Sequence, residues 1–334
     1  MALPSSMTAI EIGAAGGPEV LRVTTRPVPA PGRGQLLLKV AAAGVNPHDC
    51  IQRRRGAPPP GATDIPGIEV CGTVVAAGDG VAPDMARAGR LVCSLCNGGS
   101  YAEYCVVEAP LAFDVPDGID AIEGAGIQET LFTAWLNAIE LGKLEPGQWM
   151  LVHGGTGGVS SRAIQLGRLL GAHVIATSGS AEKREICKAL GAEVTIDYTQ
   201  GGIADAVLRI TEGRGVDVVI DVTGPRYFTE NLRALAPDGR VTYIGVVGGD
   251  DTCTFPLRAL TAKRAAVLGA QLRVSPLALK LKMAQAIRER VWPAIGKTIR
   301  TRVDSTFPLA QAVDAHRRIE SGAHIGKVVL VVGK

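Results

Sequence analysis

The sequence predicts an α/β protein in which a doubly wound parallel sheet is joined to a smaller, mainly β domain. Its 334 residues exceed what one ordinary core needs and fit two domains. Up to about Gly124 the chain is rich in glycine, proline and short β-like runs, which is typical of a loop-rich β domain. Beyond that point β-like runs alternate with helical patterns. This alternation predicts a parallel sheet covered by helices on both faces.

The individual elements follow from the hydrophobic pattern along the chain. Short β-like runs of the first domain lie at residues 35–42, 70–77, 90–95 and 102–107. Six runs predict the strands of the parallel sheet, at 149–153, 173–177, 193–197, 216–221, 239–247 and 265–271. Amphipathic segments at 161–170, 181–190 and 203–211 predict helices between them.

The tail, from residue 276 onward, has one or two helical patterns and a closing strand at 327–332. It is too short to fold alone, so we expect it to return to the first domain. The predicted division is therefore 1–124 with 270–334 for the β domain, and 125–269 for the sheet domain.

Composition argues against membranes and nucleic acids as partners. No apolar run reaches the length of a membrane span, and the N-terminus lacks the basic start and apolar core of a signal peptide. Lys and Arg number 35 against 32 for Asp and Glu, and the one basic cluster, at 52–55, is expected to be a solvated loop. We expect a soluble, cytoplasmic protein.

The seven cysteines are odd in number and irregularly spaced, which favours reduced thiols over a disulfide framework. Cys93 and Cys96 form a C-x-x-C pair, and no second pair near by would complete four metal ligands. Buried thiols are the favoured interpretation, and a metal site is the alternative.

A glycine-rich turn, HGGTGGVSS at 153–161, follows the first strand of the predicted sheet and precedes a helix. Such a turn places backbone N–H groups against a pyrophosphate at a helix N-terminus, where the helix dipole also favours anions. The third glycine of the dinucleotide fingerprint is replaced by Ser160. That position serves close packing of helix on strand, so a small residue can substitute. Together with five further strands, the turn predicts dinucleotide binding.

The end of the second predicted strand bears on the choice between NADH and NADPH. An acidic residue there would bind the ribose 2′-OH of NAD. The run 173–177 continues instead into Ser-Gly-Ser at 178–180, and no carboxylate follows until Glu182, beside Lys183. Hydroxyls and a cation suit the 2′-phosphate of NADPH. We therefore predict NADPH. The alternative is that Ser180 only caps a helix and the lysine is solvated.

Five further motifs accompany the glycine turn: GVNPHD at 44–49, IPGIEVCGTV at 65–74, GGSYAEY at 98–104, ETLFTAW at 129–135 and HIGKVVL at 324–330. With them the chain resembles the medium-chain dehydrogenase/reductase superfamily, and within it the zinc-free, zeta-crystallin-like NADPH:quinone oxidoreductases. The resemblance covers nearly the whole chain. It implies a GroES-like catalytic domain split around a Rossmann domain, NADPH in the cleft between them, and a homodimer joined through the sixth strands.

The resemblance also assigns site residues by motif. Asn46 would lie beside the nicotinamide ribose and Thr133 would approach the cofactor, and these two are the candidate catalytic residues. Further cofactor-binding residues would be Gly154, Thr156, Gly157, Gly158 and Val159 at the turn, and Gly179, Ser180, Lys183 and Tyr198 around the 2′-phosphate. The nicotinamide half would meet Gly245, Val246 and Val247, with Gly269, Gln271, Leu272 and Lys327 completing the set.

Zinc-bearing members of the superfamily place a cysteine and a histidine where this chain has Asn46 and Ile68. Without thiolate or imidazole ligands a catalytic zinc has no suitable partners, so we predict no metal. Glu69 is interpreted as a structural carboxylate. A second departure is Ala57, where relatives often carry a substrate-facing tyrosine. Its absence removes one proton donor from the pocket.

Three functions follow from this sequence. The first is an NADPH-dependent reductase that transfers hydride or electrons to a quinone without metal. The second delivers hydride to the carbon–carbon double bond of an enone or enoyl thioester, and the third is an NADPH-binding protein with little catalytic role. Asn46 is the candidate for orienting the ribose or the acceptor oxygen. His48 and His153 are weaker candidates for the proton donor.

Overall fold

The structure is a computed structural model that describes residues 3–245, 252–255 and 257–333. The chain divides into two units. Unit 1 comprises Met1–Glu129, Arg273–Gln285 and Ala294–Lys334, and unit 2 comprises Thr130–Leu272 and Ala286–Pro293. The boundaries expected from the sequence differ from these by a few residues, and the segment Ala286–Pro293 belongs to the unit other than the expected one.

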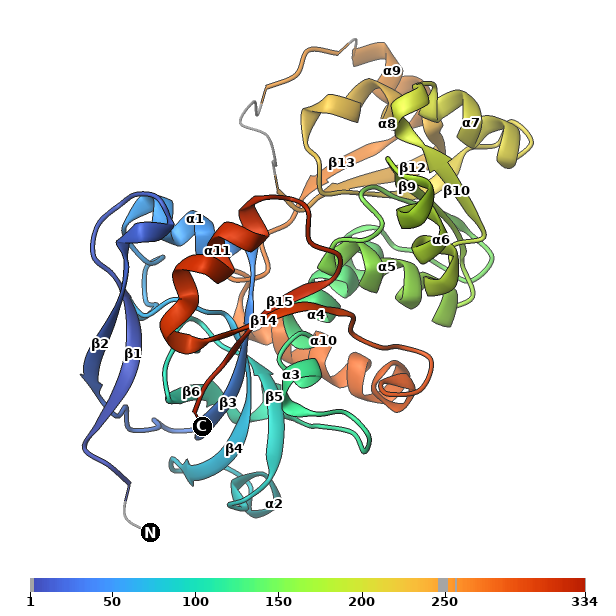
Figure 1. Ribbon diagram of the computed structural model, residues 1–334. Helices are drawn as coiled ribbons and strands as arrows, with labels where there is room; N and C mark the ends of the chain where they lie inside the picture. The colour runs from blue at the N-terminus through green and yellow to red at the C-terminus, as the bar shows by residue number, and fades with distance from the viewer. Residues whose placement is uncertain (1–2, 246–251, 256, 334) are drawn as a thin grey trace. The chain divides into compact units, whose positions relative to one another are not determined.

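Unit 1 is built on a seven-stranded sheet. Its strands follow the order β14 (Val303–Pro308), β15 (Lys327–Val331), β3 (Gln35–Val45), β4 (Glu69–Ala77), β5 (Leu91–Leu95) and β7 (Phe113–Asp114), and β6 (Tyr104–Glu108) also pairs with β3. A separate two-stranded sheet joins β1 (Ser6–Ile12) to β2 (Leu21–Pro27). Because β15 pairs antiparallel with β3, the last strand of the chain lies beside an early one (Figure 1).

The helices that lie wholly within unit 1 are short. They are α1 (Pro47–Arg55), α2 (Pro83–Ala86), α3 (Ala121–Gly124) and α11 (Ala312–Glu320). Helix α11 packs on β14 and β15 and contacts α1. The main core of this unit lies between the sheet and these elements, and its buried side chains include Ile10, Leu36, Val70, Tyr101 and Leu330. The packing places α1, which follows β3 directly, against the C-terminal part of the chain.

Unit 2 contains a six-stranded parallel sheet in the order β10-β9-β8-β11-β12-β13. The strands are β8 (Trp149–Val152), β9 (His173–Ser178), β10 (Val194–Asp197), β11 (Val216–Asp221), β12 (Leu235–Tyr243) and β13 (Ala266–Gly269). This is the Rossmann strand order. Successive strands are added in one direction from β8 to β10 and in the opposite direction from β11 to β13, so the order switches between β8 and β11. Ligands of such sheets bind at this switch point, outside the carboxyl ends of the strands.

The helices of unit 2 form two groups. Helices α5 (Gly158–Leu169) and α6 (Ala181–Leu190) pack on strands β8 to β10, whereas α8 (Phe228–Ala234) and α9 (Leu257–Lys263) pack on β12, and α7 (Ile203–Ile210) packs on α8. Figure 1 shows the two groups on opposite faces of the sheet. Helix α4 (Gln128–Trp135), the π-helical segment η3 (Leu136–Leu141) and α10 (Leu277–Arg290) complete the longer helical elements of the described chain.

The doubly wound sheet predicted from the sequence is confirmed, with a strand at each of the six predicted runs. The fifth strand begins earlier than predicted, at Leu235, and ends at Tyr243; part of the predicted run lies outside the described residues. The sequence pattern missed β1, β2, β7 and β14. In β2, for example, only Leu21 of the seven residues is buried, so the strand lacks the apolar alternation that predicts strands.

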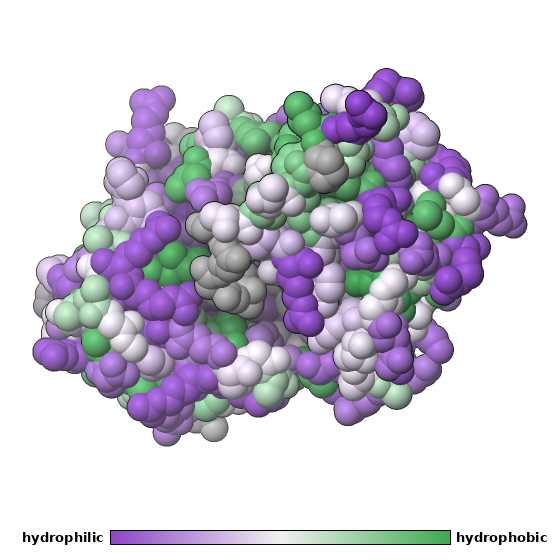
Figure 2. Space-filling model, turned by 90° about the horizontal axis from the view of Figure 1, so that it is seen from above, coloured by the Kyte–Doolittle hydropathy of each residue, from purple (hydrophilic) through white to green (hydrophobic). Residues whose placement is uncertain are grey.

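The surface is mixed in hydropathy. On the face shown in Figure 2, hydrophilic residues are interspersed with smaller hydrophobic groups. Within the part of the chain that the structure describes, no helix has the length and apolar character needed to cross a membrane.

Candidate nucleotide site and candidate active site

The glycine turn joins β8 to α5 in unit 2, and two of its glycines are required by geometry. Gly154 has a φ of +65°, a left-handed conformation that favours glycine. A Cβ on Gly155 would overlap the Cys187 thiol and lie 3.3 Å from the Cβ of Ala176. A Cβ on Gly157 would meet its nearest neighbour only at 3.7 Å. Close packing against α6 therefore explains Gly155 but not Gly157.

Ser160, the residue at the third fingerprint position, is 1% exposed. Its Oγ donates a hydrogen bond of 2.8 Å to the carbonyl oxygen of His153, the residue that follows β8. The hydroxyl thus ties the first turn of α5 to the end of the strand. Ser160 serves the packing purpose expected of a small residue, and adds a hydrogen bond that glycine cannot make.

Helix α5 begins at Gly158 with Gly157 as its N-cap, and among the described residues no side chain caps this end. Val159 lies in the first turn and Thr156, in the turn itself, is 6% exposed. The backbone amides of a helix start lacking a side-chain cap are suited to a phosphate, which also meets the positive end of the helix dipole. The residues predicted for the pyrophosphate therefore converge on one helix N-terminus.

The four residues predicted for the 2′-phosphate lie around the end of β9. A Cβ on Gly179 would be 2.6 Å from the hydroxyl oxygen of Tyr198, so this tyrosine packs directly on the glycine. Ser180 is the N-cap of α6, and its Oγ accepts a hydrogen bond of 3.2 Å from the backbone N–H of Lys183. Ser180 therefore has the helix-cap role that was considered for it. As the cap, it directly follows Gly179, on which Tyr198 packs.

A second cation near this position was not predicted from the sequence. The guanidinium carbon of Arg226 lies 5.9 Å from the ring centre of Tyr198 and 5.2 Å from that of Tyr227. Arg226 follows β11 in the run DVTGPRY at 221–227, far along the chain from Gly179. Only the parallel order of the sheet brings the loops after β9, β10 and β11 together. Charged residues in the loops after successive strands are the signal that could have identified it.

His153, a candidate proton donor, is instead enclosed in a polar network. Its Nδ1 lies 3.0 Å from the Thr177 hydroxyl and its Nε2 2.7 Å from the Asn231 side-chain oxygen. Asn231 donates in turn to Asp221 over 2.6 Å. Burial lowers the pKa of His153. Both ring nitrogens are engaged, so His153 is a structural residue beneath the glycine turn, not the proton donor.

The candidate active site of unit 1 is a buried cluster formed by Asn46, Glu69 and Lys327. Asn46 directly precedes α1, Glu69 begins β4 and Lys327 begins β15, so three neighbouring elements meet at this point. The Lys327 Nζ donates to the side-chain oxygen of Asn46 over 2.6 Å and pairs with the Glu69 carboxylate at 2.5 Å. The Lys327 side chain is 5% exposed and the Glu69 side chain 1%. The sequence named all three residues but not their contact.

These contacts determine what the Asn46 amide can do. Its Nδ2 donates to Glu69 at 3.0 Å and to the Gly44 carbonyl at 3.3 Å, so both amide hydrogens are engaged. Its Oδ1 faces a lysine, which has no acceptor, and this fixes the orientation of the amide. One lone pair of Oδ1 remains. Asn46 is therefore arranged to accept a hydrogen bond, as from a hydroxyl group, and not to donate one.

The three hydrogens of the Lys327 ammonium have three partners in this cluster: Asn46, Glu69 and the Val45 carbonyl at 3.3 Å. All three hydrogens of Lys327 are thus engaged within the cluster, and the ammonium holds the Asn46 amide in place. The second Glu69 oxygen accepts from the backbone N–H of Glu129 at 3.1 Å. A buried ion pair needs such additional hydrogen bonds to offset the cost of desolvation.

A second polar layer supports the start of α1. The Asp49 carboxylate accepts from the Asn46 backbone N–H at 2.8 Å and from the Tyr101 hydroxyl at 3.2 Å. Burial raises the pKa of Asp49 to about 6. The Tyr101 hydroxyl also lies 3.1 Å from the Nε2 of His316, whose pKa burial lowers to about 3. His48 is half-buried, and burial and Arg273 lower its pKa to about 4. These histidines are neutral near pH 7.

The remaining predicted residues are distributed over unit 2. Thr133 lies in α4, is 3% exposed, and its carbonyl accepts from the Asn137 side chain at 2.8 Å. Gly269 ends β13, Gln271 is exposed and Leu272 is buried, whereas Gly245 is exposed after β12. Val246 and Val247 lie outside the described residues. Asn46 and Lys327 belong to unit 1, so the structure presents the predicted residues as two groups, one in each unit.

The residues at the position of the zinc site do not suit that metal. An amide stands at Asn46 and an aliphatic side chain at Ile68, and the Lys327 ammonium bonds the amide oxygen. A cation at this place would repel Zn²⁺, which prefers thiolate, imidazole and carboxylate ligands. Among the described residues no group of three His, Cys, Asp or Glu side chains could hold a metal ion. In the C-x-x-C pair, Cys93 is buried and burial raises its pKa, while Cys96 is half-buried.

Comparison with known proteins places this geometry in a family. Residues 32–117 match the alcohol dehydrogenase GroES-like domain, and residues 158–287 match the zinc-binding dehydrogenase family. The quinone oxidoreductase of Rattus norvegicus is 30% identical over 98% of both chains. One subunit of the phenolphthiocerol/phthiocerol polyketide synthase of Mycobacterium tuberculosis is 32% identical over 90% of this chain and 14% of its own length.

Two solved structures are similar throughout. A mycobacterial protein solved in complex with NADPH is 33% identical with a TM-score of 0.85, over 97% of this chain and 100% of its own. An NAD-dependent alcohol dehydrogenase is 31% identical with a TM-score of 0.84, over 98% of this chain and 100% of its own. The GroES-like and Rossmann domains implied by the resemblance are therefore present. The chain belongs to the medium-chain dehydrogenase/reductase superfamily, among its quinone oxidoreductases, and is an oxidoreductase that uses a pyridine nucleotide.

Proposed function

We propose that this protein is an NADPH-dependent quinone reductase that works without a metal. The observation that carries the choice of NADPH is the end of β9, where Ser180 and Tyr198 flank Gly179 with Lys183 and Arg226 near by. The nearest acid along the chain from Tyr198 is Asp197, and its carboxylate is paired with Arg184 at 2.8 Å. Two cations beside hydroxyl groups suit a phosphate. The similarity to a protein solved with NADPH supports the same choice.

The residues that would hold NADPH are the turn from Gly154 to Val159 at the pyrophosphate and Gly179, Ser180, Lys183 and Tyr198 at the adenosine phosphate. When bound, the cofactor supplies a hydride. Gly245, Gly269, Gln271 and Leu272, with Val246 and Val247, belong to the same proposal for the nicotinamide half, as does Thr133.

The Asn46 amide is proposed to orient the cofactor by accepting a hydrogen bond from a ribose hydroxyl. Both of its amide hydrogens are engaged by Glu69 and Gly44, so donation to the oxygen of the acceptor would require the cluster to break. Lys327 acts as a positioning residue because its contact fixes the amide. Catalysis without metal then rests chiefly on holding the acceptor against the reduced ring, an effect worth about 7–11 kcal/mol at best.

A quinone is proposed as the acceptor because of the similarity to quinone oxidoreductases over nearly the whole chain. The second candidate reaction is reduction of the double bond of an enone or enoyl thioester, supported by the similarity to a segment of a polyketide synthase. Quinones are themselves conjugated enones, so one site can serve both.

The test is steady-state oxidation of NADPH by the purified protein with 1,4-benzoquinone, 9,10-phenanthrenequinone and 3-penten-2-one, with NADH as the control cofactor. We expect faster turnover of the quinones, and a preference for NADPH. Faster turnover of the enone would establish the double-bond reductase instead. Tight NADPH binding with no turnover of any acceptor would support the third function, an NADPH-binding protein with little catalytic role.

A homodimer formed through β13 is part of this proposal. This strand pairs with β12 and lies at the end of the sheet order, and Val267 on it is 38% exposed. An edge strand with an exposed aliphatic side chain is suited to pairing with a second copy. Sedimentation equilibrium should give a dimer for the natural chain and a monomer for Val267→Lys. A monomeric natural chain would overturn this part alone.

A further inference from the structure

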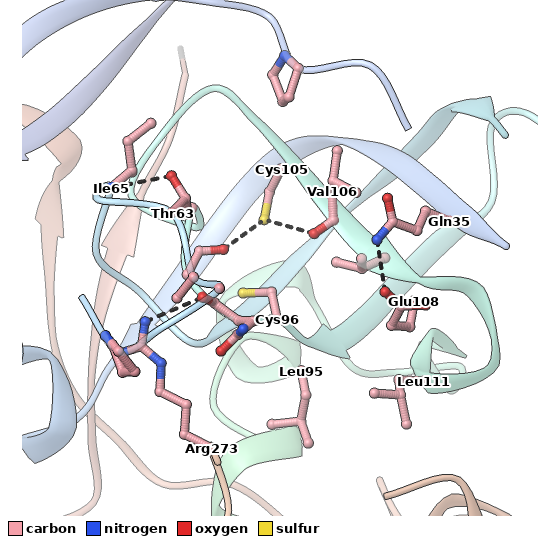
Figure 3. A pocket seen from close by; sticks show the side chains of 18 of the residues that line it. Gln35, Thr63, Ile65, Leu95, Cys96, Cys105, Val106, Glu108, Leu111 and Arg273 are labelled. Carbon is pink, nitrogen blue, oxygen red and sulfur yellow. Dashed lines mark hydrogen bonds between the residues drawn. The ribbon is translucent and has the colours of Figure 1, made fainter. Parts of the chain in front are cut away.

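Unit 1 contains a pocket of about 930 Å³ that none of the residues of the candidate active site lines. Its wall is formed by β6, by the loops around Thr63 and Gly98, and by the segment from Arg273 to Lys280 (Figure 3). The volume is within the range of pockets that hold small organic ligands. The chemistry of its wall indicates which ligands these are.

Arg273 is a buried cation in this wall. Its side chain is 7% exposed, and its guanidinium donates to the Gln52 side-chain oxygen at 2.6 Å and to the Asn97 carbonyl at 3.2 Å. Its Nε is buried and has no hydrogen-bond partner among the described residues. Figure 3 shows the bond from the guanidinium to the carbonyl. Both observed partners are neutral, so they satisfy hydrogen bonds without neutralising the charge.

No carboxylate pairs with Arg273 among the ion pairs of the described residues. The acid that acts on it electrostatically is Asp49, whose oxygens accept hydrogen bonds from Asn46, Gly67 and Tyr101. Burial lowers the pKa of Arg273. A buried charge without a counter-ion is costly, so an anion bound in the pocket would be stabilised strongly.

Lys280 adds a second cation to the same wall. Its Nζ donates to the Arg273 carbonyl at 2.7 Å, and burial together with the Arg273 charge lowers its pKa. Of the other charged residues of the wall, Arg26 pairs with Glu11 and Asp64. Glu108 accepts a hydrogen bond of 2.7 Å from the neutral Gln35 amide and lies on the side of the pocket away from Arg273 in Figure 3.

Aliphatic side chains form part of the same wall. Val274 and Leu277 are 56% and 45% exposed, although both are aliphatic. Both line the pocket, as do Ile65, Leu95 and Leu111. An uncompensated cation beside exposed aliphatic side chains matches a ligand with an acidic head and an apolar body.

We propose that this pocket binds an amphipathic organic anion, with its carboxylate or phosphate on Arg273 and its apolar chain along Val274 and Leu277. The inference does not depend on the proposed reductase activity, since it concerns binding to residues outside the candidate active site. Carboxylate and phosphate share the property that the guanidinium recognises, which is a pair of anionic oxygens.

Calorimetric titration tests the proposal, using decanoate, decyl phosphate and decanol as probes of the same apolar chain. We expect at least one of the two anions to bind about tenfold to a hundredfold more tightly than decanol, the range of a charge-assisted hydrogen bond. The tighter anion identifies the head group. Arg273→Met should abolish the difference between anion and alcohol. Arg26→Met is the matched control, because it removes a paired cation of the same wall and should leave the difference intact.

Protection of a thiol gives a second measurement independent of calorimetry. Cys96 lines the pocket and is half-buried, whereas Cys253 is exposed and the other five cysteines are buried. In the Cys253→Ser chain, the bound anion should slow alkylation of Cys96 by iodoacetamide, and Arg273→Met should remove that protection.

The proposal is wrong if decanol binds as tightly as both anions, or if Arg273→Met retains the preference. Should Arg273→Met fail to fold, Lys280→Met provides the same test, since its side chain bonds only a carbonyl. The expected loss of anion affinity is then about fivefold, as for a partly exposed charge pair. Unchanged affinity in that variant would overturn the proposal.

Discussion

The glycine turn of unit 2 and the cluster of Asn46, Glu69 and Lys327 in unit 1 are both buried polar sites at strand ends, but they are built in opposite ways. The turn is a continuous stretch whose proposed role in nucleotide binding depends on backbone amides and on missing side chains. The cluster consists of charged and polar side chains, and Asn46 lies 23 residues from Glu69 and 281 from Lys327. The turn should therefore be sensitive to added volume, and the cluster to lost charge.

The largest effect is expected from Lys327→Met. It would leave the Glu69 carboxylate buried without a counter-charge, at a cost of about 3–5 kcal/mol in the free energy of unfolding. Urea denaturation measures this, with the exposed Lys39→Met as control. Adding Glu69→Gln should recover part of the loss, because it removes the uncompensated charge. A loss no greater than that of the control would mean that charge compensation does not hold the cluster together.

The next effect concerns cofactor choice in unit 2. Lys183→Ala should weaken NADPH binding about tenfold or more, as for loss of a charged hydrogen bond, and leave NADH binding unchanged. The measurement is fluorescence titration with each cofactor. Lys188→Ala, at the other end of α6 and paired with Glu185, should change neither affinity. Equal effects of Lys183→Ala on NADPH and NADH would place the 2′-phosphate elsewhere.

Added volume in the turn is expected to have a smaller effect. Gly155→Ala would force a Cβ against the Cys187 thiol and Ala176 and should destabilise the protein by about 1–3 kcal/mol, as overpacking does. Gly157→Ala is the matched control, because the added Cβ would lie 3.7 Å from its nearest neighbour, the Gly154 carbonyl oxygen. Thermal unfolding distinguishes them. Cys187→Ala in the Gly155→Ala chain should restore part of the stability; equal melting temperatures for the two glycine variants would contradict the packing argument.

The smallest effect is expected at Ser160. Ser160→Ala removes one hydrogen bond to the His153 carbonyl and should cost about 0.5–1.5 kcal/mol of unfolding free energy, with NADPH affinity nearly unchanged. Ser161→Ala, on the same turn but half-buried, should cost less. A large loss of NADPH affinity in Ser160→Ala would instead identify the serine as a cofactor ligand.

The accuracy of prediction differed between the two units for a physical reason. In unit 2 the central strands β8, β9 and β11 are largely buried, so their apolar runs stand out, and every strand of the parallel sheet was predicted. In unit 1 the strands β1, β2 and β14 carry many polar, partly exposed residues, and the pattern missed them. The position of Arg226 could not be predicted, because its contact with Tyr198 joins the ends of β10 and β11, which are distant in sequence.

The sequence by itself determined the doubly wound sheet and the glycine turn with its helix. These depend on local backbone geometry and on the alternation of apolar residues, which a single chain segment records. Only the tertiary structure decided that Lys327 bonds Asn46 and Glu69, that His153 is enclosed, and that Arg273 is a buried cation without a carboxylate partner among the described residues. The charge state and free hydrogen-bonding capacity of a side chain depend on its neighbours in space, and segments from both ends of the chain supply those neighbours.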